Sequence, residues 1–136
     1  MNVFKEAYKW FDKAEADLLV ATQVLHDFNI KTIDISCFLS QQAVEKSLKG
    51  YLVCQGINPP RTHDLIRLRE MCAEFDASFN NLLNSDIDLS TYAVDTRYPG
   101  EEVATESEAA SALAEAKNVY IFCTSQVQAL QALSTK

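Results

Sequence analysis

Apolar residues recur every three or four positions in two long stretches, one near each end of the chain. In the first, over about residues 3–27, the apolar seam consists of Ala7, Phe11, Ala14, Leu18, Ala21 and Leu25. In the second, which starts near Thr105, it consists of Ala109, Ala112, Leu113, Ala116, Tyr120, Cys123, Val127 and Leu130. This spacing places each set on one face of a helix. The pattern therefore predicts two long amphipathic helices, and a capping box over residues 105–108 begins the second one.

A third long helix is predicted over about residues 33–54, where Cys37, Val44, Leu48 and Tyr51 share one side. Gly56 is expected to end this helix, and the Pro59-Pro60 pair then prevents helix from continuing. Thr62 is the expected N-cap of a shorter helix whose first residue would be His63. Further helical turns are expected over about residues 79–83 and 87–93, and the Pro99-Gly100 pair indicates a loop.

The composition agrees with a helical fold. Only three glycines and three prolines occur in 136 residues, which argues against a turn-rich all-β protein. Apolar residues make up 48% of the chain, enough for a real core. We expect a single all-α domain over residues 1–136: an up-down bundle of four to five helices with two long antiparallel helices. Both long terminal helices are expected to run antiparallel to the helix over residues 33–54.

Several classes of protein are disfavoured. The start of the chain has no secretory signal, and no apolar run approaches the roughly 20 residues that a membrane span needs. We therefore expect a cytoplasmic protein with no membrane partner. The four cysteines include no Cys-x-x-Cys pair and the chain has two histidines, so no metal site and no cofactor are expected. The cysteines are expected to be buried free thiols.

The formal net charge is −7, which disfavours general coating of nucleic acid. The charge is unevenly distributed, however. Between Ser40 and Glu70 there are five basic and three acidic residues, a local excess of +2. A modest basic patch of this kind fits one phosphate group or a short strand, whereas the alternative interpretation is an ordinary solvated helix face.

A polar stripe lies on the predicted helix over residues 33–54. Gln42, Glu45, Lys46 and Lys49 are spaced i, i+3, i+4 and i+7, so they share a face of a helix that is otherwise largely apolar. Glu45 and Lys49 form a favourable i, i+4 pair, so the stripe could be a partly buried network that satisfies itself. If the stripe meets Arg97 or His63 in space, a ligand site becomes the better interpretation.

Three segments in order carry a resemblance to a known family: residues 41–49 (Gln-Gln-Ala-Val-Glu-Lys-Ser-Leu-Lys), residues 62–65 (Thr-His-Asp-Leu) and residues 97–99 (Arg-Tyr-Pro). They follow a first helix that contains Trp10, Ala14, Asp17, Leu18 and Ala21. Together they resemble the HEPN family (higher eukaryotes and prokaryotes nucleotide-binding), over most of the chain from about Tyr8 to Leu130. The resemblance implies a small helical bundle that forms a homodimer. It also implies a minimal nucleotidyltransferase as a possible partner, in pairs that often act as toxin and antitoxin.

Active toxins of the HEPN family are metal-independent ribonucleases, in which an Arg is followed by four to six residues and then a His. This chain departs from that motif. No Arg stands five to seven positions before His26 or His63, and Arg61 is separated from His63 by one residue. Whether the chain is an enzyme is therefore left open, with Arg97 and His63 as the candidates for the cation and the acid or base that RNA cleavage needs.

The candidate site residues fall into two groups. Those for binding a nucleotide or a phosphate are Arg97, Tyr98, His63, Lys46, Lys49 and Arg61. Those for a supporting polar network are Gln42, Glu45 and Asp64. Structural roles compete with these: His63 at a helix start, Tyr98 packing in the bundle, Asp64 capping its own helix, and Trp10 packing rather than binding.

Three functional hypotheses follow. The favoured one is a HEPN-like module that binds a nucleotide or RNA phosphate, or that docks a nucleotidyltransferase. The first alternative is a divergent metal-independent ribonuclease that uses His63 with Arg97 or Arg61. The second alternative is a purely structural, dimeric interaction domain.

Overall fold

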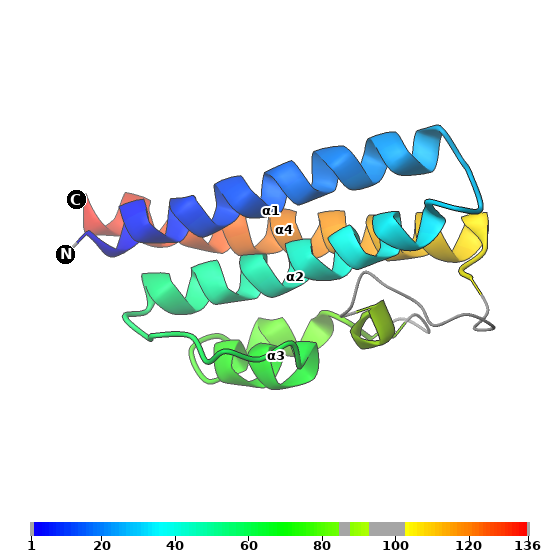
Figure 1. Ribbon diagram of the computed structural model, residues 1–136. Helices are drawn as coiled ribbons and strands as arrows, with labels where there is room; N and C mark the ends of the chain where they lie inside the picture. Colours follow the sequence, from blue (N-terminus) through cyan, green and yellow to red (C-terminus); the bar gives the residue numbers. More distant parts are fainter. Residues whose placement is uncertain (1, 85–87, 93–102, 136) are drawn as a thin grey trace.

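The computed structural model describes residues 2–84, 88–92 and 103–135. All regular secondary structure in this part of the chain is helical (Figure 1). The α-helices are α1 (Val3–His26), α2 (Ile33–Cys54), α3 (Leu65–Ala73) and α4 (Glu106–Ser134), and two 3₁₀ helices are η1 (Ala77–Asn81) and η2 (Leu89–Tyr92). The expected all-α bundle with two long antiparallel helices is confirmed, since α1 and α4 run in opposite directions.

The direction of α4 relative to α2 differs from the prediction. Figure 1 shows α2 and α4 both running opposite to α1, so α2 and α4 are parallel. In agreement, the backbone N–H of Ala104, just before α4, donates to Asp34 in the first turn of α2 over 3.0 Å. The expectation that α4 is antiparallel to α2 was wrong because the segment with α3 and η2 returns the chain to the start of α2 before α4 begins.

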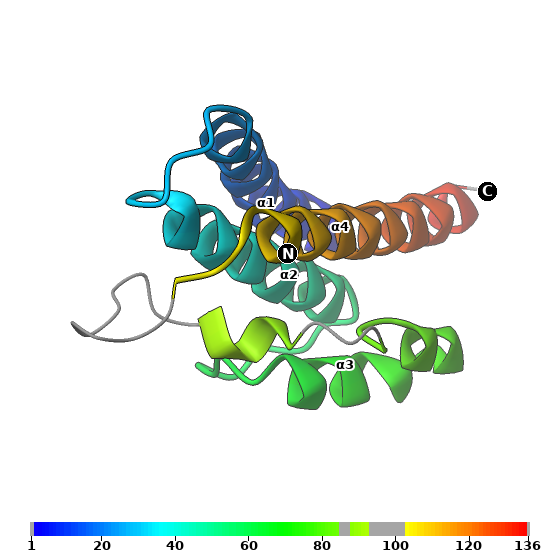
Figure 2. The same ribbon diagram turned by 90° about the vertical axis from the view of Figure 1, so that its right-hand side faces the viewer.

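Helix α2 is the centre of the bundle. Fifteen of its 22 residues are buried, so it has no continuous solvent-facing side. Figure 2 shows α2 lying between the pair formed by α1 and α4 and the layer that contains α3. Most polar residues in this helix are therefore shielded from water and need partners within the protein.

Small residues bring α1 and α2 close together. Ala7, Ala14 and Ala21 on α1 are completely buried. Opposite them, Gly50 of α2 packs against the ring of Phe11, and a Cβ at position 50 would lie 2.6 Å from Phe11 Cε1. Such an approach is available only to glycine unless the ring shifts.

The connection from α2 to α3 places His63. Helix α2 ends where Gly56 adopts a positive φ of 80°, as expected of a glycine after a helix. The predicted N-cap at Thr62 was wrong: Asp64 is the N-cap, its Oδ1 accepting from Arg67 N over 3.1 Å. Thr62 Oγ1 accepts instead from Asp64 N. His63 therefore precedes α3 rather than opening it, and its side chain reaches back to α2.

Candidate polar site on helix α2

Glu45 is the centre of the polar site. It lies in the middle of α2, and the residue is only 5% exposed. Its Oε1 lies 2.6 Å from His63 Nδ1, and its Oε2 lies 3.1 Å from Lys49 Nζ. The carboxylate thus joins its own helix to the segment before α3, and the sequence could raise the contact with His63 only as a possibility.

Gln41 extends this network and was missed by sequence reasoning. Its side chain is completely buried, and its Nε2 donates to Glu45 Oε1 over 3.4 Å. Gln42 Nε2 in turn donates to Gln41 Oε1 over 2.7 Å, so Gln42 reaches Glu45 only through Gln41. The signal was present in the sequence: residues 41, 45 and 49 are spaced by four, which places them on one stripe of a helix.

Lys46 does not belong to this network. Its Nζ binds Asp17 Oδ2 of α1 over 2.6 Å, and both side chains are partly exposed. One position along a helix turns a side chain by about 100°, so a neighbour of Glu45 faces a different helix. The polar stripe predicted from the sequence is thus two separate arrangements, one facing His63 and one joining α2 to α1.

Burying the Glu45 carboxylate carries a desolvation cost that its partners offset. Both it and Lys49 are largely removed from water, with side chains 7% and 9% exposed. The Lys49 ammonium also lies 6.0 Å from the centroid of the Trp10 ring, within cation–π range. A buried ion pair is retained when further hydrogen bonds complete it, as Gln41 and His63 do here.

His63 combines a fixed nitrogen with an accessible ring. Its side chain is 65% exposed although Nδ1 is held by Glu45. A neutral imidazole that donates Nδ1–H to a carboxylate carries its lone pair on Nε2. In the described part of the chain, no hydrogen bond to Nε2 is found. The arrangement leaves one nitrogen of an oriented ring facing solvent, suited to proton transfer or to contact with an anion.

The remaining predicted site residues do not form one group in the structure. Asp64 caps α3, as one of the sequence interpretations had it. Arg61 is exposed. Arg97 and Tyr98, which were predicted to bind a nucleotide or a phosphate together with His63, lie outside the described residues. Over residues 2–84, 88–92 and 103–135, no group of three potential metal ligands occurs.

The four cysteines are all buried and free, as expected. Burial raises the pKa of the Cys72 thiol to about 12 and that of Cys123 well above its ordinary value. Thiols that hold their protons so firmly are poor nucleophiles. Cys72 and Cys123 are therefore poor candidates for a nucleophile.

A known protein family matches most of this chain. The HEPN domain model matches residues 7–126, from within α1 to within α4. The chain belongs to the HEPN family. The Glu45–His63 contact thus joins two of the three segments that suggested this family from the sequence. Among the described residues of this HEPN domain, no helix has the length and hydropathy to cross a membrane.

Two solved structures are similar to this HEPN domain. ST0689, an archaeal HEPN homologue, is 25% identical with a TM-score of 0.64, and the match covers 89% of this chain and 97% of ST0689. TT1696 from Thermus thermophilus is 26% identical with a TM-score of 0.64, and the match covers 92% of this chain and 98% of TT1696. A comparison with curated proteins finds no match.

Proposed function

We propose that this HEPN domain binds the phosphate groups of a nucleotide or an RNA at the surface around His63. The observation that carries the proposal is the 2.6 Å contact between His63 Nδ1 and the buried Glu45 carboxylate, which orients an imidazole that is 65% exposed. A protonated imidazole has two N–H donors. Glu45 takes the one on Nδ1, which leaves the Nε2 donor for a phosphate oxygen.

Arg61 supports the same surface. It precedes His63 by two residues, is exposed, and makes no ion pair within the described residues. A guanidinium binds phosphate through two parallel hydrogen bonds, which suits it to work beside a single oriented imidazole. The acidic remainder of the chain then limits binding to a short stretch of phosphates.

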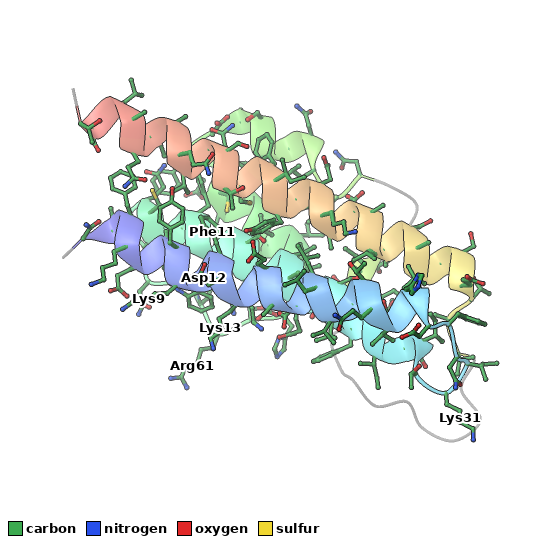
Figure 3. All side chains as sticks on the ribbon, turned by 90° about the horizontal axis from the view of Figure 1, so that it is seen from above. Lys9, Phe11, Asp12, Lys13, Lys31 and Arg61 are labelled. Atoms are coloured by element: carbon green, nitrogen blue, oxygen red, sulfur yellow. The ribbon has the colours of Figure 1, made fainter. Side chains whose placement is uncertain are left out.

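Binding of ATP, GTP and a short single-stranded RNA, measured by calorimetry at low salt, tests this proposal. We expect His63→Ala and Arg61→Ala each to weaken binding severalfold. Lys31→Ala is the matched control: it removes one exposed cation from the connection between α1 and α2, well away from Arg61 (Figure 3), and should leave affinity unchanged. Absence of binding to all three ligands would overturn the proposal.

A ribonuclease is the second candidate, because the Glu45–His63 pair also resembles an acid–base arrangement. A carboxylate on Nδ1 fixes the tautomer and leaves Nε2 to accept a proton from a ribose 2′-hydroxyl. Arg61 would stabilise the charge on the phosphorane. Cleavage of structured RNA in the presence of EDTA, giving 2′,3′-cyclic phosphate ends and lost in His63→Ala, would support this activity; intact RNA would reject it.

An assembly role is favoured by a different surface. Between α1 and α4 lies a mainly apolar hollow of about 420 Å³, flanked by Leu19 and Ile121, which are 60% and 61% exposed. Glu15 and Lys117 lie in the same hollow, so a second copy related by a twofold axis could pair each with the other. We expect Leu19→Glu to convert a dimer to a monomer in light scattering; a wild-type monomer at micromolar concentration would reject this role. A nucleotidyltransferase partner, which the family resemblance implies, needs a separate test: whether the neighbouring reading frame in the source genome encodes a short nucleotidyltransferase.

A further inference from the structure

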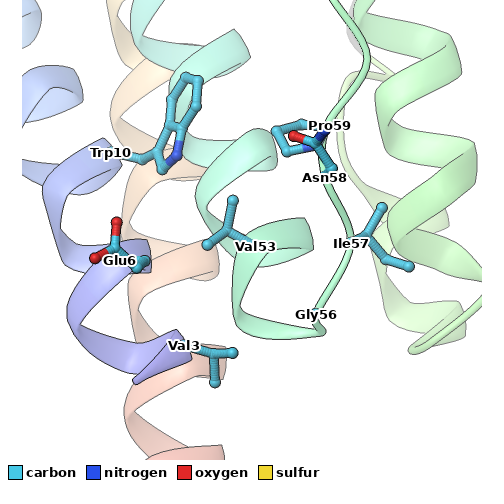
Figure 4. Close-up of a pocket in the computed structure, with 8 residues that line it drawn as sticks. All are labelled: Val3, Glu6, Trp10, Val53, Gly56, Ile57, Asn58 and Pro59. Carbon is cyan, nitrogen blue, oxygen red and sulfur yellow. The ribbon is translucent and has the colours of Figure 1, made fainter. Parts of the chain in front are cut away.

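Trp10 on α1 forms a wall shared by two adjoining hollows. The first, of about 320 Å³, is mainly apolar and is lined by Val3, Trp10, Val53, Ile57 and Pro59 among others. Figure 4 shows Trp10 on one side of it and Pro59 on the other, with Val53 of α2 between them. The second, of about 280 Å³, is lined by Trp10, Glu6, Lys9, Lys13 and Lys46. An aromatic ring thus lies between an apolar and a cationic surface.

The lysines of the second hollow differ in their pairing. Lys9 binds Glu6 over 3.0 Å, and Lys46 binds Asp17 over 2.6 Å. Lys13 has no ion pair with any described residue. Figure 3 shows Lys9, Lys13 and Arg61 extending from the same edge of the molecule. The cation most available to an anionic ligand beside Trp10 is therefore Lys13.

Trp10 is connected to the Glu45–His63 site through Lys49. The Lys49 ammonium lies 6.0 Å from the Trp10 ring centroid and 3.1 Å from Glu45 Oε2. The chain that carries Pro59 along the first hollow continues four residues later to His63. Lys49 therefore links Trp10 to the carboxylate that binds His63.

We propose that the apolar hollow takes a nucleobase stacked on Trp10, while Lys13 holds the phosphate attached to that nucleotide. A nucleotide carries a planar apolar face and an anion, which matches a tryptophan placed between apolar and cationic surfaces. This inference rests on the proposed phosphate binding at His63 and Arg61, and it adds a site for the base and a further cation, Lys13, for the phosphate.

The intrinsic fluorescence of Trp10 provides the test, because it is the only tryptophan in the chain. AMP, a short single-stranded RNA and ribose 5-phosphate are titrated into the intact protein. We expect saturable quenching by AMP or by the RNA and none by ribose 5-phosphate, which lacks a base. Tighter binding of the RNA than of AMP would assign the base to a strand, and the reverse order would assign it to a free nucleotide.

Variants separate stacking from charge. Calorimetry measures the variants, because those at position 10 lack the only tryptophan. Trp10→Leu should weaken binding of the preferred ligand roughly tenfold or more, and Trp10→Phe should retain most of the affinity because a ring is kept. Lys13→Ala should weaken both AMP and ribose 5-phosphate severalfold, with Lys31→Ala as the matched control. Thermal unfolding of Trp10→Phe checks that the bundle is intact.

Two results would overturn the inference. Unchanged affinity in Trp10→Leu, with binding still lost in His63→Ala, would reject the stacking site and leave the proposed function standing. Absence of any binding by nucleotide, RNA or ribose 5-phosphate would reject both.

Discussion

His63 Nδ1 lies 2.6 Å from Glu45 Oε1 across a separation of 18 residues, and this contact ties the segment before α3 to the centre of α2. One partner is exposed and the other is buried, so each half of the pair has a different consequence when it is removed. Loss of the imidazole alters the surface, whereas loss of the carboxylate charge alters the core.

Glu45→Gln should destabilise the fold by about 2 kcal/mol or more, because it leaves the Lys49 ammonium buried without its counter-charge. Chemical denaturation measures the change in free energy of unfolding. Glu70→Gln, at an exposed position on α3, is the matched control and should be nearly neutral. A double variant, Glu45→Gln with Lys49→Met, should recover part of the loss; no recovery would contradict the pairing.

Gly50→Ala should lower the free energy of unfolding by about 1–3 kcal/mol, since the added Cβ would meet the Phe11 ring at 2.6 Å. Phe11→Leu in the same chain should relieve part of the clash, which a double-mutant cycle detects. Gly56→Ala serves as the comparison. It meets open space but has a positive φ, so its cost should not respond to Phe11→Leu.

The capping box of α4 predicts a pH dependence. Hydrogen bonds from the backbone and side chain of Thr105 lower the pKa of Glu108 from its ordinary value. A carboxyl with a lowered pKa in the folded state contributes stability above its unfolded pKa, and that contribution is lost as the pH falls through the folded pKa. Thr105→Ala keeps the backbone N–H that Glu108 accepts, so NMR titration should show the Glu108 pKa rising only part of the way to its ordinary value. An unchanged value would show that the Thr105 side chain does not contribute.

The buried thiols should be unreactive in the native protein. Burial raises the pKa of Cys72 to about 12, so almost no thiolate exists at pH 8. A thiol reagent at that pH should label Cys72 and Cys123 only slowly, and denaturant should release both at once. In alkaline solution the buried thiols should destabilise the fold. The unfolded thiol loses its proton at a lower pH than the folded one, so the free energy of unfolding falls as the pH rises past the unfolded pKa. Fast labelling of the native protein would contradict this assignment.

The extent of each long helix could be predicted because the relevant signals are local. Apolar spacing, the Thr105 capping box and Gly56 act within a few residues, and α2 has the bounds that the sequence indicated. The predicted N-cap of α3 was wrong, although capping is also a local signal. Thr62 and Asp64 are both good capping residues two positions apart, and sequence alone did not decide which of them would start the helix.

The candidate site depended on distant contacts. Spacing by four marked Glu45 and Lys49 as a pair, and it could also have marked Gln41. It could not show that Lys46 turns to Asp17, because that depends on which helix packs against each side of α2.

By itself, the amino-acid sequence determined the helical class, the long helices and the residues of the HEPN motifs, since periodicity and capping are properties of short segments. Only the tertiary structure decided that α2 and α4 run parallel and that His63 binds Glu45. These outcomes depend on the path of the chain between α2 and α4. That path is set by the combined packing of all the helices, which no single segment encodes.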